Sequence, residues 1–296
     1  MYDIIIVGAG PAGLTAAIYA LRARKKVLIF EAKSYGGQIV TAPLVENYPG
    51  IESISGFDYA TNLYNQVLKL GGEFKFETVL RIDEGNIVTT KNGSYEAKAI
   101  ILATGADKKK LNIENEDKYL GKGISYCATC DGNFFKEKTV AVVGGGNAAL
   151  DDALYLSNIV KKLYLIHRRD DFRADQYVSE LEGKDNVEFI YSSTVNKLIG
   201  DSKLEGIEIL NNYGETVELK VDGLFISIGQ EPQNKMFSNI IELDDFGYIK
   251  TEDGVHTSKP KIYVAGDARP KQLRQLVTAI SDGAIAATTA IKEMGE

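Results

Sequence analysis

The sequence contains little cysteine, because its 296 residues include only Cys127 and Cys130. A secreted scaffold held together by disulfides uses more cysteines, in several pairs. Histidine is equally scarce, and His167 and His256 stand far apart in the chain. Since a structural zinc ion takes four ligands at short spacings, these shortages argue against a zinc site, and we expect no bound metal.

Long hydrophobic runs are also missing. No stretch approaches the ~20 apolar residues that span a membrane. The chain begins Met1-Tyr2-Asp3, without the basic start of a secretory signal, and its first apolar run stops at Gly8. We therefore expect a soluble cytoplasmic protein with no membrane partner.

A surplus of positive charge is the third absence. The formal net charge is −7, from 34 basic and 41 acidic residues. Because nucleic-acid binding needs clustered Lys and Arg to contact phosphates, we expect no nucleic-acid partner. The composition, with 44% hydrophobic and 25% charged residues, suits a globular protein with a real core, and the length suits two domains.

A strand, a glycine-rich turn and a helix follow one another at the start of the chain. The β-branched residues 2–7 are typical of a buried strand, and Gly-Ala-Gly-Pro-Ala-Gly follows at positions 8–13. Residues 14–23, rich in Ala and Leu, predict a helix, and residues 26–31 predict a second strand. This order is the βαβ unit that a dinucleotide fingerprint requires.

The same plan returns in mid-chain. Residues 139–143 predict a strand, Gly-Gly-Gly-Asn-Ala-Ala follows at 144–149, and residues 150–157 and 162–166 predict a helix and a second strand. The spacing agrees, because Gly8 to Glu31 and Gly144 to His167 are both 23 positions (31 − 8 and 167 − 144). One G-x-G-x-x-G is weak evidence, but two matched copies predict two nucleotide sites.

Further strands indicate how the two copies are joined. Residues 99–105 and 223–229 predict matching strands that close on glycine, whereas the strand at 262–267 has no second copy. We therefore predict an α/β protein of two Rossmann-like, three-layer nucleotide-binding domains, the second inserted into the first. The predicted bounds are residues 1–112 with 245–296 for the discontinuous domain and residues 113–244 for the inserted one.

The two sites are predicted to take different nucleotides. Glu31, at the end of the first βαβ unit, can accept hydrogen bonds from ribose hydroxyls but would repel a 2′-phosphate, which suits FAD or NAD. The second copy instead carries His167, Arg168 and Arg169, with Arg173 beyond. Arginine presents a planar fork that suits a phosphate, so the second site favours NADPH.

Cys127 and Cys130 form a C-x-x-C pair just before the second glycine turn. The remaining interpretations of such a pair in a reducing compartment are a redox disulfide and half of a metal site. Asp131 follows directly and is placed to exchange a proton with the thiols. A hydride donor and a disulfide need a flavin between them, so the motifs together indicate a relay.

The assembled motifs resemble those of the bacterial low-molecular-weight thioredoxin reductases, within the pyridine nucleotide-disulfide oxidoreductases. The resemblance runs over nearly the whole chain. It is carried by residues 8–13, Gly36-Gly37-Gln38, 46–50, Ala103-Thr104-Gly105, 127–132, 144–149, His167-Arg168-Arg169 with Arg173, Gly266-Asp267 and Arg274-Gln275. One departure is Ala148, where the family often has Ser or Thr.

The resemblance implies a homodimer, with FAD in the discontinuous domain and NADPH and the dithiol in the inserted domain. It implies that Cys130 lies beside the flavin in one state, that Asp131 is the acid, and that the inserted domain rotates. The expected flavin contacts are Gly8, Gly10, Gly13, Glu31, Gly37, Gln38, Asn47, Thr104, Gly105, Gly266, Asp267, Arg274 and Gln275. The expected NADPH contacts are Gly144, Gly146, Asn147, Ala149, His167, Arg168, Arg169 and Arg173.

The implied activity is NADPH-dependent reduction of thioredoxin or a thioredoxin-like protein through the catalytic residues Cys127, Cys130 and Asp131. A similar enzyme fed by ferredoxin is the main alternative, although relatives of that kind have lost the NADPH motifs that stand here. A non-catalytic redox sensor is a third hypothesis, but it has no need of two differently tuned nucleotide sites. Which cysteine attacks the partner protein stays open.

Overall fold

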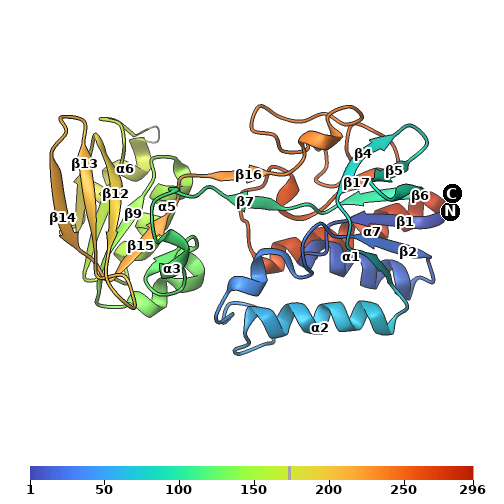
Figure 1. Ribbon diagram of the computed structural model, residues 1–296, viewed down its shortest axis with the longest axis horizontal. Coiled ribbons are helices and arrows are strands. Elements are labelled where there is room, and N and C mark those ends of the chain that lie inside the picture. Colours follow the sequence, from blue (N-terminus) through green and yellow to red (C-terminus); the bar gives the residue numbers. More distant parts are fainter. Residues whose placement is uncertain (173–174, 296) are drawn as a thin grey trace. The chain divides into compact units, whose positions relative to one another are not determined.

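The computed structural model describes residues 1–172 and 175–295, which divide into two compact units (Figure 1). Unit 1 is formed by Met1–Asp107 and Glu231–Glu296, and unit 2 by Lys108–Gln230. The second unit is therefore inserted into the first, as the repeated motif predicted. No helix of the described residues has the length and apolarity needed to cross a membrane.

Unit 1 is built on a seven-stranded sheet in the order β3-β2-β1-β6-β5-β4, with β17 also paired to β6. The strands β3, β2, β1, β6 and β17 are parallel, and β5 and β4 continue from β6 as an antiparallel hairpin. The strands are β1 (Tyr2–Val7), β2 (Val27–Phe30), β3 (Glu73–Lys75), β4 (Val79–Asp83), β5 (Ile87–Thr90), β6 (Gly93–Leu102) and β17 (Ile262–Val264).

The helices of unit 1 are α1 (Pro11–Arg22), α2 (Gly56–Lys69) and α7 (Leu276–Gly295), with 3₁₀ turns η1 (Gly37–Thr41), η3 (Lys235–Phe237) and η4 (Gly266–Ala268). Successive side chains of a strand point to opposite faces of its sheet. Ile4 and Ile6 accordingly join one apolar core, with α1 and α7, whereas Ile5 and Val7 join a second core with Phe237. The sheet is thus covered on both faces.

Unit 2 repeats this plan with a parallel sheet in the order β11-β10-β9-β15-β8. Val140 and Val142 pack with α5 on one face, and Ala141 and Val143 pack on the other face with a three-stranded antiparallel sheet. The strands are β8 (Ile124–Ser125), β9 (Thr139–Val143), β10 (Lys162–Ile166), β11 (Val187–Ile190), β12 (Ser193–Ile199), β13 (Gly206–Asn211), β14 (Thr216–Lys220) and β15 (Gly223–Ile226).

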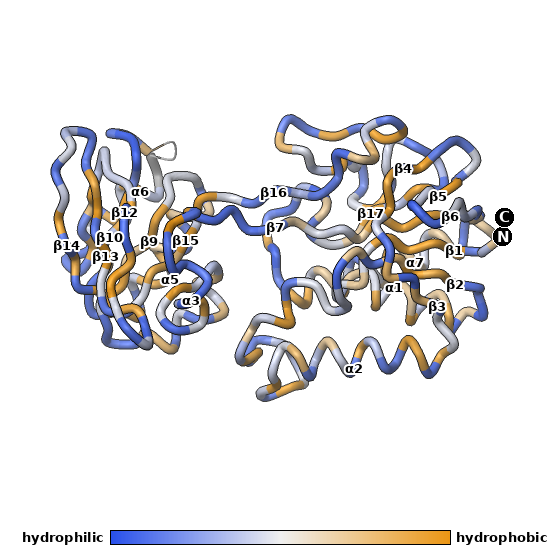
Figure 2. Tube along the Cα trace, viewed as in Figure 1, coloured by the Kyte–Doolittle hydropathy of each residue, from blue (hydrophilic) through white to orange (hydrophobic). Residues whose placement is uncertain are grey.

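The helices of unit 2 are α3 (Glu116–Tyr119), α4 (Ala128–Asp131), α5 (Asn147–Ser157) and α6 (Asp175–Glu182), with the 3₁₀ turn η2 (Gly132–Phe135). Hydrophobic residues concentrate along the sheet strands of each unit, whereas α2 alternates between hydrophobic and hydrophilic residues (Figure 2). Both fingerprint helices begin earlier than the sequence predicted, at Pro11 and Asn147, because each glycine turn runs directly into its helix.

The connections between the units are β7 (Ala106–Lys108) and β16 (Gln230–Pro232), which pair as a two-stranded sheet. The sequence placed the domain bounds after residues 112 and 244, but the structure divides the chain after Asp107 and Gln230. The second bound differs most, because Phe237 and Ile241 are buried in the core of unit 1. Their apolar side chains, rather than the polar residues that follow, decide where this segment belongs.

Close packing of α1 against α7 fixes the C-terminal helix in unit 1. A Cβ atom on Gly283 would lie 2.1 Å from the backbone oxygen of Ala12, which is far inside contact distance. Gly295, in the last turn of the same helix, has no atom within 4 Å of such a Cβ among the described residues. The two glycines therefore differ in their surroundings within one helix.

We expect Gly283→Ala to lower the free energy of unfolding by about 1–3 kcal/mol, because α1 and α7 must separate. Gly295→Ala is the matched control and should leave stability unchanged or slightly higher, since alanine favours helix. Chemical denaturation followed by circular dichroism measures both values. Equal stability of the two variants would contradict the steric argument.

Candidate functional site

The carboxyl ends of four parallel strands meet at one edge of the sheet in unit 1. Val7 of β1 is in register with Phe30 of β2 and Leu102 of β6, and Leu102 is in register with Val264 of β17. Ligands of open α/β sheets bind outside this edge. Many of the expected flavin residues follow these strand ends directly, so the topology gathers them there.

The first glycine turn requires glycine for steric reasons. Gly8 has φ 108°, and a Cβ atom there would lie 2.3 Å from the backbone oxygen of Ala103. On Gly13 a Cβ atom would lie 1.9 Å from the oxygen of Gly8. Gly10 is the N-cap of α1, and a Cβ atom on Gly37 would lie 3.2 Å from its Cα. The turn therefore presents bare backbone at the start of α1.

Glu31 and Gln38 bind backbone groups in the same region. The Oε2 atom of Glu31 accepts a hydrogen bond from the Ala9 amide at 2.9 Å, and its Oε1 atom accepts one from the Lys33 amide at 2.9 Å. The side-chain amide of Gln38 donates to the oxygen of Ala106. Since each carboxylate oxygen can accept two hydrogen bonds, Glu31 can hold the turn and still accept a ribose hydroxyl.

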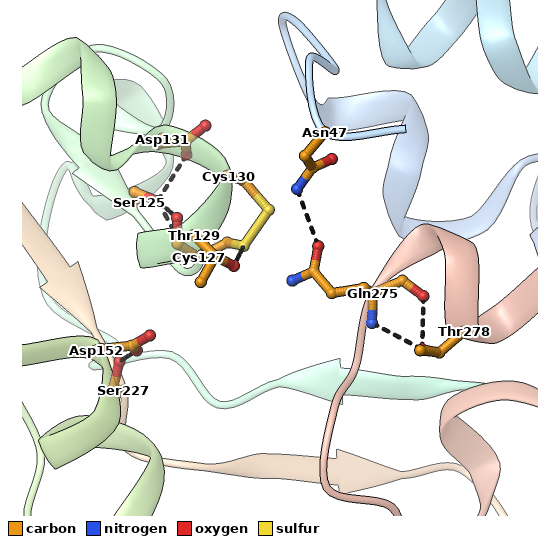
Figure 3. The surroundings of a disulfide bond; sticks show 10 residues. All are labelled: Asn47, Ser125, Cys127, Thr129, Cys130, Asp131, Asp152, Ser227, Gln275 and Thr278. Atoms are coloured by element: carbon orange, nitrogen blue, oxygen red, sulfur yellow. Dashed lines mark hydrogen bonds between the residues drawn. A yellow bond between two sulfur atoms is a disulfide. The ribbon is translucent and has the colours of Figure 1, made fainter. Parts of the chain in front are cut away.

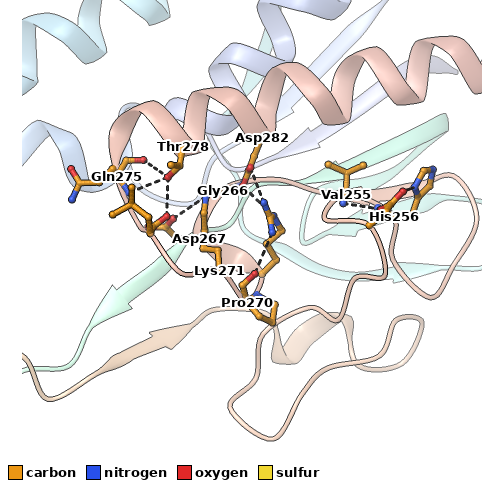
Figure 4. A network of polar contacts seen from close by, with 12 residues as sticks. Val255, His256, Gly266, Asp267, Pro270, Lys271, Gln275, Thr278 and Asp282 are labelled. Atoms are coloured by element: carbon orange, nitrogen blue, oxygen red, sulfur yellow. Dashed lines mark hydrogen bonds and ion pairs between the residues drawn. The ribbon is translucent and has the colours of Figure 1, made fainter. Parts of the chain in front are cut away.

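A buried ion pair network, which the sequence did not reveal, positions Gly266 and Asp267 (Figure 4). Asp282 of α7 accepts hydrogen bonds from the Gly266 amide at 3.0 Å and from Lys271 Nζ at 2.8 Å, and pairs with Arg269 Nη2 at 2.8 Å. The side chains of Asp282 and Lys271 are only 7% and 6% exposed. Removing one partner of such a buried pair costs about 3–5 kcal/mol, so this network fixes the turn after β17.

The structure brings Asn47 and Gln275 together from distant parts of unit 1. Asn47 Nδ2 donates to Gln275 Oε1 at 3.1 Å, and the hydroxyl of Thr278 accepts from the Gln275 amide at 3.1 Å (Figure 3). Arg274 lies over the ring of Tyr248, 4.8 Å from its centroid. Arg274 and Gln275, the two expected flavin contacts nearest the C-terminus of the chain, thus have defined positions.

Asn234 is a second positioning residue that the sequence did not reveal. It has no exposed surface, and its Oδ1 atom accepts from the Thr104 hydroxyl at 2.7 Å. Its Nδ2 atom donates to the oxygens of Gly247 at 3.0 Å and Ala268 at 2.9 Å. One amide therefore joins the turn after β6, which carries the expected contacts Thr104 and Gly105, to the segment after Asp267.

These features of unit 1 fit a dinucleotide such as FAD. The N-cap of α1 makes no side-chain capping bond within the described residues, so the first amides of this helix can receive a pyrophosphate. The Nε atom of Arg274 is buried and has no hydrogen-bond partner among the residues that the structure describes. A buried donor without a partner is costly, and an acceptor on a bound cofactor would satisfy it.

The second glycine turn, in unit 2, shares the central contact of the first. Gly144 has φ 155°, and a Cβ atom there would lie 2.3 Å from the backbone oxygen of Ser227. Gly146 is the N-cap of α5, which Asn147 begins, and a Cβ on Gly146 would meet nothing within 4 Å among the described residues. Ala149 stands where the first turn has its third glycine, so this copy tolerates a methyl group there. The bare backbone fits a second pyrophosphate.

His167 has a structural contact with this turn. A Cβ atom on Gly145 would lie 1.9 Å from the His167 ring, so the imidazole lies directly against the turn. The ring stacks on Phe172 with centroids 4.8 Å apart. Burial, with the charges of Arg169 and Arg168, lowers the pKa of His167, which favours the neutral ring at pH 7.

Arg168 and Arg169 follow β10 and are exposed to solvent. Because β10 is parallel to β9 with Ile166 in register with Val143, the arginines follow the same edge as the Gly144 turn. This position suits the ribose end of a nucleotide whose pyrophosphate lies on α5. Arg173, expected to act with them, lies outside the described residues.

The two cysteines form a disulfide within unit 2, with Cα atoms 5.3 Å apart (Figure 3). Cys127 precedes α4 and Cys130 lies within it, and Cys130 is exposed whereas Cys127 is partly buried. Ser125 joins the pair to the acid, because its hydroxyl accepts from the Cys127 amide at 3.0 Å and donates to Asp131 Oδ2 at 2.6 Å. Because both sulfur atoms are joined in this disulfide, the pair does not serve as half of a metal site in this state.

Asp131 and Glu116 are two partly or fully buried carboxyl groups that bind the dithiol segment. Burial raises the pKa of Asp131, and the Ser125 hydroxyl partly opposes this shift. A raised pKa is the direction of shift that suits a general acid. Glu116, which the sequence did not single out, accepts from the Asn112 amide at 2.8 Å and from the hydroxyl of Tyr126. It thereby fixes the residue before Cys127.

Comparisons with known proteins agree with this arrangement. The family model of the pyridine nucleotide-disulphide oxidoreductases matches residues 2–283. The chain is 42% identical to a thioredoxin reductase of Listeria monocytogenes over 302 positions, covering 100% of this chain and 95% of the relative. It is 43% identical to a thioredoxin reductase of Treponema pallidum, covering 98% and 96%. The crystal structure of thioredoxin reductase from Streptococcus pyogenes matches with a TM-score of 0.94 at 38% identity, covering 100% of this chain and 98% of that one.

Substitutions at Gly144 and Gly146 should distinguish an effect on folding from an effect on nucleotide binding in the second turn. We expect Gly146→Ala to fold normally, because its Cβ meets no atom, yet to weaken binding of NADPH at least about tenfold, since the methyl group occupies the face that a pyrophosphate approaches. Gly144→Ala should instead lower the free energy of unfolding by about 1–3 kcal/mol. Calorimetric titration and thermal unfolding distinguish the two effects. Unchanged NADPH affinity of Gly146→Ala would count against the site.

Proposed function

This chain belongs to the pyridine nucleotide-disulphide oxidoreductase family, and from that premise we propose that it is a thioredoxin-disulfide reductase. Electrons would pass from NADPH through FAD to the Cys127–Cys130 disulfide and on to thioredoxin or a thioredoxin-like protein. One observation carries the proposal: unit 2 contains both a disulfide beside a partly buried acid, Asp131, and a glycine turn suited to a nucleotide. The two thioredoxin reductases that are 42% and 43% identical to this chain support it over nearly the full length.

The residues of this chain divide the chemistry as follows. FAD, when bound, mediates between the hydride of NADPH and the disulfide. We assign its binding to the unit 1 residues around Gly8, Glu31 and Asp267, and that of NADPH to the turn at Gly144 with Arg168 and Arg169. Reduction of the disulfide consumes two electrons and two protons and leaves two thiols.

Asp131 is proposed to handle a proton at the dithiol. Burial raises its pKa above the usual value for aspartate, and Ser125 keeps its carboxyl group beside the Cys127 segment. One cysteine, as the thiolate, then attacks the disulfide of the partner protein to form a mixed disulfide. The other cysteine displaces the partner, which leaves as a dithiol and restores the Cys127–Cys130 bond.

The assembly and location are further parts of the proposal. We infer a homodimer from the resemblance to the thioredoxin reductases. We infer a cytoplasmic location because an NADPH-fed dithiol acts in a reducing compartment, where structural disulfides are rare. Sedimentation measurements on the purified protein test the first inference.

A thioredoxin reductase fed by ferredoxin is the competing candidate. Arg168 and Arg169 argue against this candidate, because two exposed guanidinium groups after β10 suit the 2′-phosphate of NADPH. Comparing NADPH and reduced ferredoxin as electron donors separates the two functions. Faster reduction by ferredoxin would favour the alternative.

Anaerobic NADPH should bleach the yellow colour of the FAD-loaded protein. Cys127→Ser and Cys130→Ser should retain FAD and this bleaching, but their reduction of thioredoxin should fall to background, because a single thiol cannot complete the exchange. Absorbance of the flavin and coupled thioredoxin turnover measure the two steps. A flavin that stays oxidised with NADPH, or turnover by either variant, would overturn the proposed route.

Replacing both Arg168 and Arg169 with Gln should raise the KM for NADPH by about 100-fold or more and leave the KM for NADH within about threefold. Each charge-assisted hydrogen bond contributes roughly 1.5–3 kcal/mol, and tenfold corresponds to about 1.4 kcal/mol. A variant with Lys203→Gln and Lys220→Gln loses the same charge from two exposed side chains of unit 2 and is the control. Equal losses with NADPH and NADH would refute recognition of the 2′-phosphate.

A further inference from the structure

The side chain of Thr129, which stands between the two cysteines, contacts one of the sulfur atoms that react (Figure 3). Its Oγ1 atom lies 3.5 Å from Cys127 Sγ. Because this sulfur is bonded to Cys130 and carries no hydrogen, the Thr129 hydroxyl is the donor and the sulfur is the acceptor. The C-x-x-C motif leaves position 129 unspecified, so the spacing alone assigns this residue no role.

The two sulfur atoms of the disulfide have different surroundings. Cys127 is partly buried, its amide donates to the Ser125 hydroxyl at 3.0 Å, and its sulfur accepts from Thr129. Cys130 is exposed, and within the described part of the chain no side chain donates a hydrogen bond to its sulfur. The hydroxyl of Thr129 is therefore directed at the sulfur of Cys127.

The backbone of α4 fixes the position of this hydroxyl. The Asp131 amide donates to the oxygen of Cys127 at 3.1 Å, which closes the turn that contains Thr129. Ala128 has no exposed surface and belongs to the same apolar core as Leu150 of α5. Since a β-branched side chain has few rotamers, a fixed backbone leaves the Thr129 hydroxyl few directions in which to point.

The contact gains strength when the disulfide opens. Sulfur in a disulfide is a weak acceptor, whereas a hydrogen bond to an ionised acceptor is about twice as strong as a neutral one. A hydrogen bond to the charged form of a group also favours that form. The Thr129 hydroxyl therefore stabilises a thiolate on Cys127 more than it stabilises the disulfide.

We propose that Thr129 is a catalytic residue of the redox pair, whose hydroxyl stabilises the thiolate of Cys127 and thereby favours opening of the disulfide. Opening the S–S bond takes up two electrons and, with one proton, leaves a thiolate on Cys127 and a thiol on Cys130. Stabilising that thiolate stabilises the reduced pair. Thr129 thus helps the disulfide to accept electrons and keeps Cys127 in its nucleophilic form.

The inference rests on the proposed function, since it concerns the same disulfide, but its tests need neither NADPH nor thioredoxin. A protein inactive as a reductase would still report both measurements. The elements around the dithiol turn carry other titratable groups, and every variant compared below retains them, so differences between variants report on the hydroxyl. These groups are Asp131 of α4, Asp151, Asp152 and Tyr155 of α5, and Glu116 and Tyr126 before Cys127.

The first test uses FAD-loaded Cys130→Ser protein, in which Cys127 is a single thiol. Iodoacetamide reacts with the thiolate, so the alkylation rate, followed by mass between about pH 6 and pH 10, rises with ionisation. We expect Thr129→Val, which keeps the shape but loses the hydroxyl, to raise the pH of half-maximal rate by about 0.5 to 1, a three- to tenfold weaker ionisation. Thr129→Ser keeps the hydroxyl and should stay near the parent value. The matched control is Thr216→Val, the same change on an exposed residue of β14.

The second test uses the intact pair. The FAD-loaded protein is equilibrated with reduced and oxidised dithiothreitol at pH 8, and its thiols are trapped with iodoacetamide and counted by mass. Dithiothreitol loses two electrons and two protons as it closes to its cyclic disulfide. The Cys127–Cys130 bond takes up both electrons and at least one proton, and any other proton enters the buffer. Thr129→Val should shift this equilibrium toward the protein disulfide by about two- to fivefold.

Three results would overturn the proposal. One is a Thr129→Val protein that matches Thr216→Val in either test. Another is an alkylation rate lowered by the same factor at every pH, because altered access to the sulfur has that effect without any change of ionisation. The third is a Thr129→Ser protein that behaves as Thr129→Val, since the hydroxyl is then not the cause. If Thr129→Val does not fold, Thr129→Ala also removes the hydroxyl and is judged in the same way.

Discussion

Both nucleotide turns depend on one steric constraint, which is the absence of a side chain where a glycine meets the backbone oxygen of the neighbouring strand. Gly8 meets Ala103 after β6, and Gly144 meets Ser227 after β15, each with 2.3 Å between that oxygen and a Cβ built on the glycine. In each unit, this close contact lets the backbone turn sharply from the strand into the helix. The first amides of α1 and α5 consequently open at the carboxyl edge of each sheet, where a phosphate can bind them.

The sequence predicted the parts of the fold that local patterns specify. The strands at residues 2–7 and 139–143 are dense in β-branched residues, and the glycine turns follow them directly, so a short stretch of sequence is enough to recognise them. Local patterns did not locate the boundary at which the inserted unit ends. Polar residues 242–245 suggested a connection, but the buried residues Phe237 and Ile241 attach the preceding segment to the core of unit 1.

The positioning residues of the candidate site were harder to predict than the residues they hold. Asp267 and Thr104 stand in short motifs, whereas Asp282 and Asn234 are single polar residues with no pattern around them. Their roles come from long-range contacts, since Asn234 binds the Thr104 hydroxyl across 130 positions of sequence. Because a buried amide or carboxylate needs partners from several segments, only the folded chain shows which polar residues act in this way.

Ser227 shows how the duplicated plan has diverged. Its backbone oxygen makes the close contact with Gly144, and its hydroxyl donates a hydrogen bond to Asp152 of α5. In unit 1 the equivalent residue is Ala103, which has no hydroxyl, and that unit contains no cysteine. One residue of unit 2 thus contacts both the nucleotide turn and α5, the helix against which Ala128 of the dithiol turn packs.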